Sequence, residues 1–179
     1  MSIPLNLRYN KEKLDEEIFD WVEEVESIEE FNELLTDKKI VEDNEGNQKI
    51  VYAHPNLVFV LFATNPPCMN CMQQAYIIYK AMIPTDIEIY YVDVDRHDRI
   101  VQALFGVKNP PQFEVPKFFF FKNGKRVELV YRQQKDYTSK SFTLFSVDSL
   151  MPEDLLVELL YTIYHPKPKK VKQSEISKS

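Results

Sequence analysis

Glycine is scarce in this sequence: only three of the 179 residues are glycines, at positions 46, 106 and 124. Loops that hold a nucleotide phosphate with backbone N–H groups need several closely spaced glycines. The dinucleotide-binding fingerprint and the nucleoside-triphosphate loop are therefore excluded. An esterase nucleophile elbow is excluded as well, because no serine stands between suitably spaced glycines.

Cysteines are few, and long apolar runs are missing. The two cysteines, Cys68 and Cys71, are too few for a disulfide framework or a four-thiolate zinc site. No apolar run is long enough to span a bilayer. The first residues also lack the apolar stretch, about 7–15 residues long, of a secretory signal. We therefore expect an intracellular protein, in the cytoplasm, with no membrane partner.

Positive charge is lacking over most of the chain, whose formal net charge is −6. Residues 1–50 carry 15 acidic and 6 basic side chains, and residues 51–164 are close to neutral. Affinity for phosphate groups comes from clustered lysine and arginine, so we expect no nucleic-acid partner. Basic residues gather only in residues 165–179, with five bases and one acid. This Pro- and Lys-rich segment is predicted to be a disordered tail that serves solubility, docking to an acidic surface or nuclear import.

The length suits one domain with appendages. We predict an acidic N-terminal arm over residues 1–26, with a helix-compatible stretch from Lys11 to Val22. An α/β domain is expected over residues 27–164, and its polar segment 133–149 is interpreted as an insertion. The basic tail covers residues 165–179. The arm and the tail are the places where we expect a protein partner to bind.

Hydrophobic periodicity and turn residues give the order of elements within the domain. Ser27 and Glu30 form a capping box, which predicts a helix start. The further predicted elements are a strand over 56–64, a helix from 68 to Pro84, a strand over 87–94, a helix over 98–105, a strand over 117–121 with its return strand over 126–132, and a helix over 152–164. Strand–helix–strand order implies parallel pairing, and Asn123–Gly124 implies an antiparallel hairpin. The expected fold is α/β, a small mixed sheet with helices on both faces.

The two cysteines stand three residues apart, directly after a buried strand and at the first turn of a helix. The free N–H groups and the dipole of a helix N-terminus stabilise a thiolate there. We expect Cys68 to be exposed and to act as the nucleophile. Cys71 is expected to be buried, with a raised pKa, and to resolve the mixed disulfide.

Several short motifs around the cysteine pair resemble thioredoxin in order and spacing. They are Cys68-Met69-Asn70-Cys71, Tyr91-Val92-Asp93-Val94-Asp95, Leu104-Phe105-Gly106-Val107, Val115-Pro116 and Phe121-Lys122-Asn123-Gly124. The resemblance covers roughly Ser27 to Tyr164. It implies a thioredoxin-like fold and thiol–disulfide exchange. It also implies that Pro116 follows a cis peptide bond and faces the cysteines, and that Val115 offers its backbone to an extended substrate.

The sequence departs from the thioredoxin pattern at several positions near the cysteines. Pro67 stands where the family usually has tryptophan, and Met69–Asn70 replaces its Gly-Pro pair. Phe62 occupies the place of a buried acid that helps move protons to the second cysteine, and Tyr91 occupies the place of the partner lysine. The loop before Pro116 is longer, with residues 109–114 inserted.

Other chemistry-bearing residues have ordinary interpretations beside the functional ones. A metal site would need two more ligands, and His54 and His97 show no ligand spacing to the cysteines, so no metal is expected. Asp93 and Asp95 are interpreted as a strand end and a helix cap, with a catalytic carboxylate as the minority interpretation. His97 is interpreted as a solvated loop residue.

The sequence thus predicts an enzyme, a thioredoxin-type protein disulfide oxidoreductase without organic cofactor or metal. Its expected partners are protein disulfide substrates and an electron-donating reductase. The alternative is a thioredoxin-like interaction module within a larger assembly, in which the cysteines are not essential. The acidic arm, the insertion and the basic tail favour that alternative, because a stand-alone reductase does not need them.

Overall fold

A computed structural model provides the structure, and it describes residues 18–127, 129–135, 138–144, 146–148 and 150–166. In chain order the elements are the 3₁₀ helix η1 (Ile18–Trp21), β1 (Glu23–Glu24), α3 (Ile28–Thr36), β2 (Lys38–Glu42), β3 (Gln48–Tyr52), β4 (Asn56–Phe62), α4 (Met69–Lys80), β5 (Glu88–Asp93), α5 (Asp98–Phe105), β6 (Lys117–Lys122), β7 (Lys125–Arg126), β8 (Leu129–Lys135), β9 (Thr138–Leu144), β10 (Ser146–Asp148) and α6 (Glu153–Tyr164). Of the helices described, none is both long enough and apolar enough to cross a membrane.

The central sheet is mixed, with strand order β1-β5-β4-β6-β10 and with β7 paired to β6. Strand β4 runs parallel to β5 and antiparallel to β6. Residues 57–62 of β4 are all fully buried, because both faces of this central strand are covered. The continuous apolar run in the sequence is therefore the middle of the sheet, as such runs are in helix-flanked sheets.

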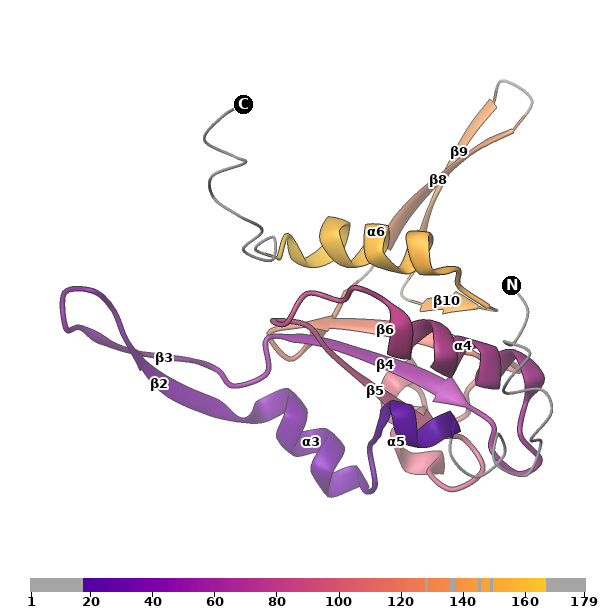
Figure 1. Ribbon diagram of the computed structural model, residues 1–179, viewed down its shortest axis with the longest axis horizontal. Helices are drawn as coiled ribbons and strands as arrows, with labels where there is room; N and C mark the ends of the chain where they lie inside the picture. The colour runs from indigo at the N-terminus through magenta and orange to yellow at the C-terminus, as the bar shows by residue number, and fades with distance from the viewer. Residues whose placement is uncertain (1–17, 128, 136–137, 145, 149, 167–179) are drawn as a thin grey trace.

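The two faces of the sheet are covered by different helices. Helices α4 and α6 lie on one face and α3 and α5 on the other (Figure 1). Alternate residues of β6 divide between the two cores: Phe118 and Phe120 join α4 and α6, whereas Phe119 and Phe121 join α3 and α5. The α/β class with a mixed sheet and helices on both faces is confirmed.

Tyr164, at the end of α6, joins that helix to the two middle strands. Its hydroxyl donates to the carbonyl oxygen of Leu57 in β4 at 2.7 Å and accepts from the N–H of Phe121 in β6 at 3.1 Å. The side chain is buried, and burial raises the pKa of its phenol above the ordinary range. The contact fixes the C-terminal end of α6 over the start of β4.

The predicted arm over residues 1–26 divides in the structure. Its last nine residues pack within the domain: Ile18, Phe19, Val22 and Val25 are buried, and β1 pairs with β5 in parallel. Of the helix expected from Lys11 to Val22, the part from residue 11 to residue 17 lies outside the described residues, and the described part contains η1. The physical reason is that β5 would otherwise expose its outer edge, which β1 covers over two residue pairs.

The predicted return strand over 126–132 and insertion over 133–149 are arranged differently in the structure. Strand β7 has only two residues, and β8 and β9 pair with each other in a separate hairpin. The segment 146–148, predicted to belong to the insertion, is β10, which completes the sheet beside the first half of β6. Figure 1 shows that the β8–β9 and β2–β3 hairpins both project from the body of the domain.

Candidate functional site

Cys68 lies at the junction between the central strand and α4. It is the N-cap of α4, and its Sγ accepts the N–H of Cys71 at 3.3 Å. Its own N–H donates to the carbonyl oxygen of Ala63 at 3.0 Å, which closes the turn that leads out of β4. The thiol is partly exposed. It therefore stands where the N–H groups of a helix start face solvent, as a reactive thiolate requires.

Cys71 lies one turn further along α4 and is fully buried. Both cysteines are free thiols. Burial raises the pKa of the Cys71 thiol far above its usual range, and the hydrogen bond and negative charge of Cys68 and the charge of Asp95 raise it further. Cys71 is buried, as expected, and Cys68, expected to be exposed, is partly exposed.

The segment before β6 lies against Cys68. The thiol of Cys68 donates to the carbonyl oxygen of Val115, with 3.8 Å between sulfur and oxygen. The Val115–Pro116 peptide bond is cis, and Pro116 is buried. The structure thus brings Cys68, Cys71, Val115 and Pro116 together, although 47 residues separate Cys68 from Val115.

Two aspartates, at the end of β5 and two residues after it, hold the turn that leads to Cys68. Asp95 Oδ2 accepts the N–H groups of Thr64 and Asn65 at 3.1 and 3.0 Å. Asp93 is buried and hydrogen-bonds to the hydroxyl of Thr64, and its other oxygen accepts the N–H of Asp95 at 3.0 Å. These carboxylates fix the backbone between β4 and the cysteines.

The expected role of Asp95 as a helix cap is wrong. The N-cap of α5 is His97, and it makes no side-chain capping bond. Asp95 instead turns toward the adjacent strand end, because parallel β4 and β5 end at the same edge of the sheet and present free N–H groups there. His97 is also less exposed than a loop residue, and its Nε2 is buried without a hydrogen-bond partner. In the sequence, the signal that could have indicated this role of Asp95 is the alternation of acids in residues 93–95.

Aromatic rings fill the place where thioredoxins have an acid and a lysine. Phe62 and Tyr91 stack with their ring centroids 5.3 Å apart, and Phe19 packs on both, at 5.4 and 5.9 Å. All three belong to the same core as Cys71. Burial raises the pKa of Tyr91 above its ordinary range, so its phenol stays protonated.

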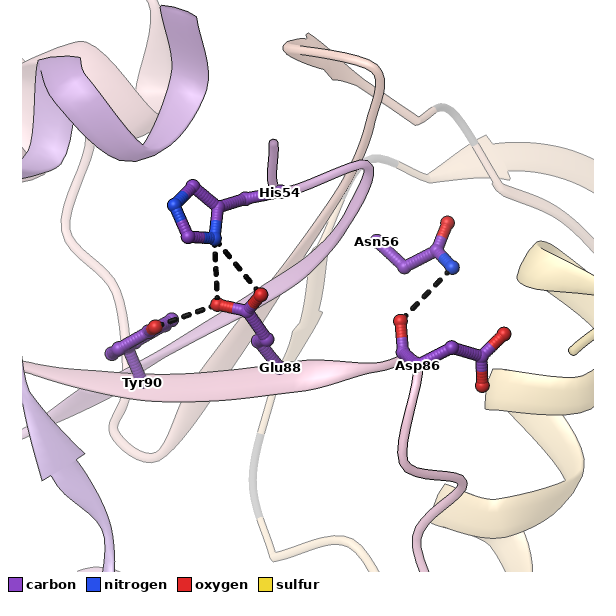
Figure 2. A network of polar contacts seen from close by, with 5 residues as sticks. All are labelled: His54, Asn56, Asp86, Glu88 and Tyr90. Carbon is purple, nitrogen blue, oxygen red and sulfur yellow. Dashed lines mark hydrogen bonds and ion pairs between the residues drawn. The ribbon is translucent and has the colours of Figure 1, made fainter. Parts of the chain in front are cut away.

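The remaining polar cluster lies at the other end of the strands. His54 Nδ1 contacts both carboxylate oxygens of Glu88, at 2.9 and 3.0 Å, and Tyr90 donates to Glu88 at 2.6 Å (Figure 2). Glu88 pairs with Leu57 at the start of β4, whereas Cys68 follows the end of that strand. His54 therefore does not approach the cysteines. Within the described ranges, no group of three or more His, Cys, Asp or Glu side chains is arranged to hold a metal ion.

No protein-family model and no curated protein matches the sequence. Similar solved structures include oxidised thioredoxin from Plasmodium falciparum, with 17% identity, a TM-score of 0.49, and coverage of 79% of this chain and 96% of that one. A thioredoxin variant from Halobacterium salinarum has 20% identity and a TM-score of 0.43, over 64% of this chain and 80% of its own. A putative oxidoreductase with a thioredoxin fold has 15% identity and a TM-score of 0.46, over 79% and 96%.

The chain has a thioredoxin-like fold. This assignment follows from the sheet order, from the cysteine pair at the start of the helix after β4, and from Pro116 directly before β6. The β2–β3 hairpin and the β8–β9 hairpin add to this thioredoxin-like body.

Proposed function

We propose that this thioredoxin-like protein exchanges its two thiols for disulfides in protein substrates. The observation that supports the proposal best is the pairing of a partly exposed Cys68, at a helix start, with a buried Cys71 whose N–H it accepts. A thiolate is the attacking species in disulfide exchange, and access of the substrate to the sulfur sets the rate. Cys68 is accessible and its Sγ accepts a helix N–H, as an attacking sulfur requires, whereas Cys71 is buried.

The proposed reaction has two steps. The Cys68 thiolate attacks one sulfur of the substrate disulfide, so that the substrate S–S bond breaks and one substrate thiolate leaves. Cys71 then loses its proton and attacks Cys68 Sγ, which breaks the mixed disulfide and releases the second substrate thiolate. The substrate gains two electrons and two protons, and the protein is left with a Cys68–Cys71 disulfide.

The substrate chain is proposed to bind along Val115 and Pro116. The carbonyl of Val115 lies beside Cys68 Sγ, so an extended backbone placed there brings its own sulfur to the nucleophile. The preceding residues 110–114 border an open hollow of about 860 Å³, which offers room for the residues that flank the substrate disulfide. Met69 is 58% exposed beside Cys68 and provides an adaptable apolar contact.

The cycle needs an electron donor, which we propose to be a reductase or a low-molecular-weight thiol in a reducing compartment such as the cytoplasm. The dithiol chemistry itself requires no organic cofactor or metal.

The proposal is tested by insulin reduction with dithiothreitol. The wild-type protein should accelerate precipitation of the insulin B chain, and Cys68→Ser should return the rate to that of dithiothreitol alone. Cys71→Ser provides the matched variant: it should accumulate a mixed disulfide through Cys68, visible as a mass increase that reductant removes. Equal rates for wild type and Cys68→Ser would contradict the proposal.

A second candidate function is that of a thioredoxin-like interaction module. It is favoured by the projecting β2–β3 hairpin, on which Ile40 and Ile50 pair across the strands while remaining 65% and 70% exposed. An isolated two-stranded hairpin is marginally stable in water and gains from a partner surface. If the protein acts as an interaction module, the double variant Ile40→Ser, Ile50→Ser should lose the function of the protein in the cell, and Cys68→Ser should keep it.

A further inference from the structure

An apolar hollow of about 380 Å³ lies at the outer edge of β5, far from the cysteines along the strand. Its apolar lining includes Trp21 from η1 and the side chains of Ile78, Ile83 and Ile87. Trp21 also packs on Tyr79, with ring centroids 4.8 Å apart. Tyr79 is 60% exposed, which extends the apolar surface outward along α4. A hollow with this lining suits an apolar side chain.

The rim of this hollow is acidic. Glu23 and Glu88 belong to its lining, and Glu88 is already bound by His54 and Tyr90. Asp20 and Asp86 are exposed on the neighbouring η1 and on the turn before β5. On the α4 side, Lys80 is already engaged, 3.7 Å from Glu153 and over the ring of Tyr76. An apolar hollow with a negative rim selects a segment that carries an apolar side chain between positive charges.

The chain leaves its described part close to this hollow. Tyr164 is fixed over Leu57, and Leu57 pairs with Glu88, which lines the hollow. Tyr164 and Ile87 also belong to the same core, on the same face of the sheet. In Figure 1, α6 ends on the side where β4 begins. With strands about 4.8 Å apart, the end of α6 and the hollow are separated by only a few strand spacings.

The residues that follow have the composition that the hollow selects. Lys167, Lys169, Lys170 and Lys172 surround the single apolar Val171. Six extended residues reach about 20 Å, which suffices for Val171 to arrive at the hollow from the end of α6. Residues 11–17, which precede η1, carry four acids and two lysines, so their charge disfavours the same place.

We propose that the lysine-rich segment 167–172 of the same chain binds over this hollow, with Val171 in the apolar part and the lysines against the acidic rim. The contact is intramolecular. The effective concentration of an attached segment is in the millimolar range, so even a weak site is occupied. Its function is to cover the part of the β5 edge that precedes Tyr90 and does not pair with β1, and it does not depend on the dithiol chemistry.

Trp21 makes the proposal testable in the full chain, because it is the only tryptophan and lies in the wall of the hollow. Quenching of its fluorescence by the neutral quencher acrylamide measures its accessibility. The screening length of charges falls from about 30 Å at 0.01 M salt to about 3 Å at 1 M, so salt should weaken the contact between the lysines and the acidic rim. The quenching constant of the wild type should therefore rise about twofold across this range.

Three full-length variants separate the proposal from its alternatives. Changing the four lysines to glutamine should give the high quenching constant already at low salt, and so should Val171→Ser. The rim variant Glu23→Gln should raise it partially. The matched control Glu45→Gln, an exposed acid at the tip of the β2–β3 hairpin, should behave as wild type.

Two results would overturn the proposal. The first is a quenching constant that none of the tail variants changes, which would leave the hollow open or covered by another segment. The second is a quenching constant that rises on dilution together with a dimeric wild type on size-exclusion chromatography, which would assign the occupant to a second copy. The intramolecular contact is supported if the quenching constant of Trp21 does not depend on protein concentration and is low only when the lysines and Val171 are intact.

Discussion

The buried thiol of Cys71 should make the reduced protein lose stability in mild alkali. Cys71 is fully buried, and burial raises the pKa of its thiol far above the usual value of about 8.5. Above that value the unfolded chain releases the proton while the folded chain retains it. The free energy of unfolding therefore falls as pH rises, and the stability contributed by the neutral thiol is complete only below the unfolded-state pKa.

The magnitude depends only on the unfolded-state pKa as long as the folded thiol stays protonated. Between about pH 8 and pH 9.5, Cys71 should lower the free energy of unfolding by about 1.2 kcal/mol. Tyr91 and Tyr164 also have raised pKa values, and they act in the same direction only at higher pH. Comparison with Cys71→Ser removes their contribution, since both proteins contain these tyrosines.

The assay is urea unfolding of the reduced wild type and of Cys71→Ser at both pH values, with a phosphine reductant present. The wild type should lose about 1.2 kcal/mol more than the variant, and Cys68→Ser should follow the wild type. If wild type and Cys71→Ser lose the same stability, Cys71 ionises as easily in the folded protein as in the unfolded chain. Its role as a protonated, sheltered second sulfur would then be refuted.

Three further predictions concern the contacts that hold the site in place. Tyr164→Phe leaves two buried backbone groups without a partner and should cost about 1–3 kcal/mol in urea unfolding. Gln74→Leu removes the paired amide bonds to the N–H and carbonyl of Met151, at 2.6 and 3.0 Å, and should cost a similar amount of roughly 1–3 kcal/mol, measured by the same assay. Gly124→Ala places a Cβ 2.7 Å from the carbonyl oxygen of Leu35 at a positive φ of 74°. The substitution should lower the free energy of unfolding by more than about 1 kcal/mol, and a thermal scan should show a melting temperature several degrees lower.

Much of the fold could be predicted because local signals and tertiary packing agree. The apolar run at the middle strand has no polar face, so it fits only a strand covered on both sides. Ser27 Oγ accepts the N–H of Glu30 at 3.1 Å, as the capping box indicated. Gly106 ends α5 in the left-handed conformation, as predicted for a glycine after the last turn.

The sheet edges could not be predicted, because short edge strands carry almost no sequence signal. Strands β1 and β7 have two residues each and β10 has three, too few for any periodicity. Their place depends on which edge the neighbouring long strand leaves open. The continuation of the chain after Asn123–Gly124 looked like one return strand, but β7 ends after Arg126 and the edge beside β6 is completed twenty residues later by β10.

At the site, the cysteine pair was accessible from its place after a strand end, and Pro116 was accessible from the resemblance of the surrounding motifs to thioredoxin. The surroundings of Cys71 were not. Phe62 and Tyr91 stand in the sequence in place of an acid and a lysine, but the sequence does not show which residue packs around their two rings. Phe19, from the segment interpreted as an arm, packs on both rings. A substitution of Phe62 by Asp would therefore place a carboxylate in a closed aromatic cluster, where burial raises the pKa of the acid and costs free energy.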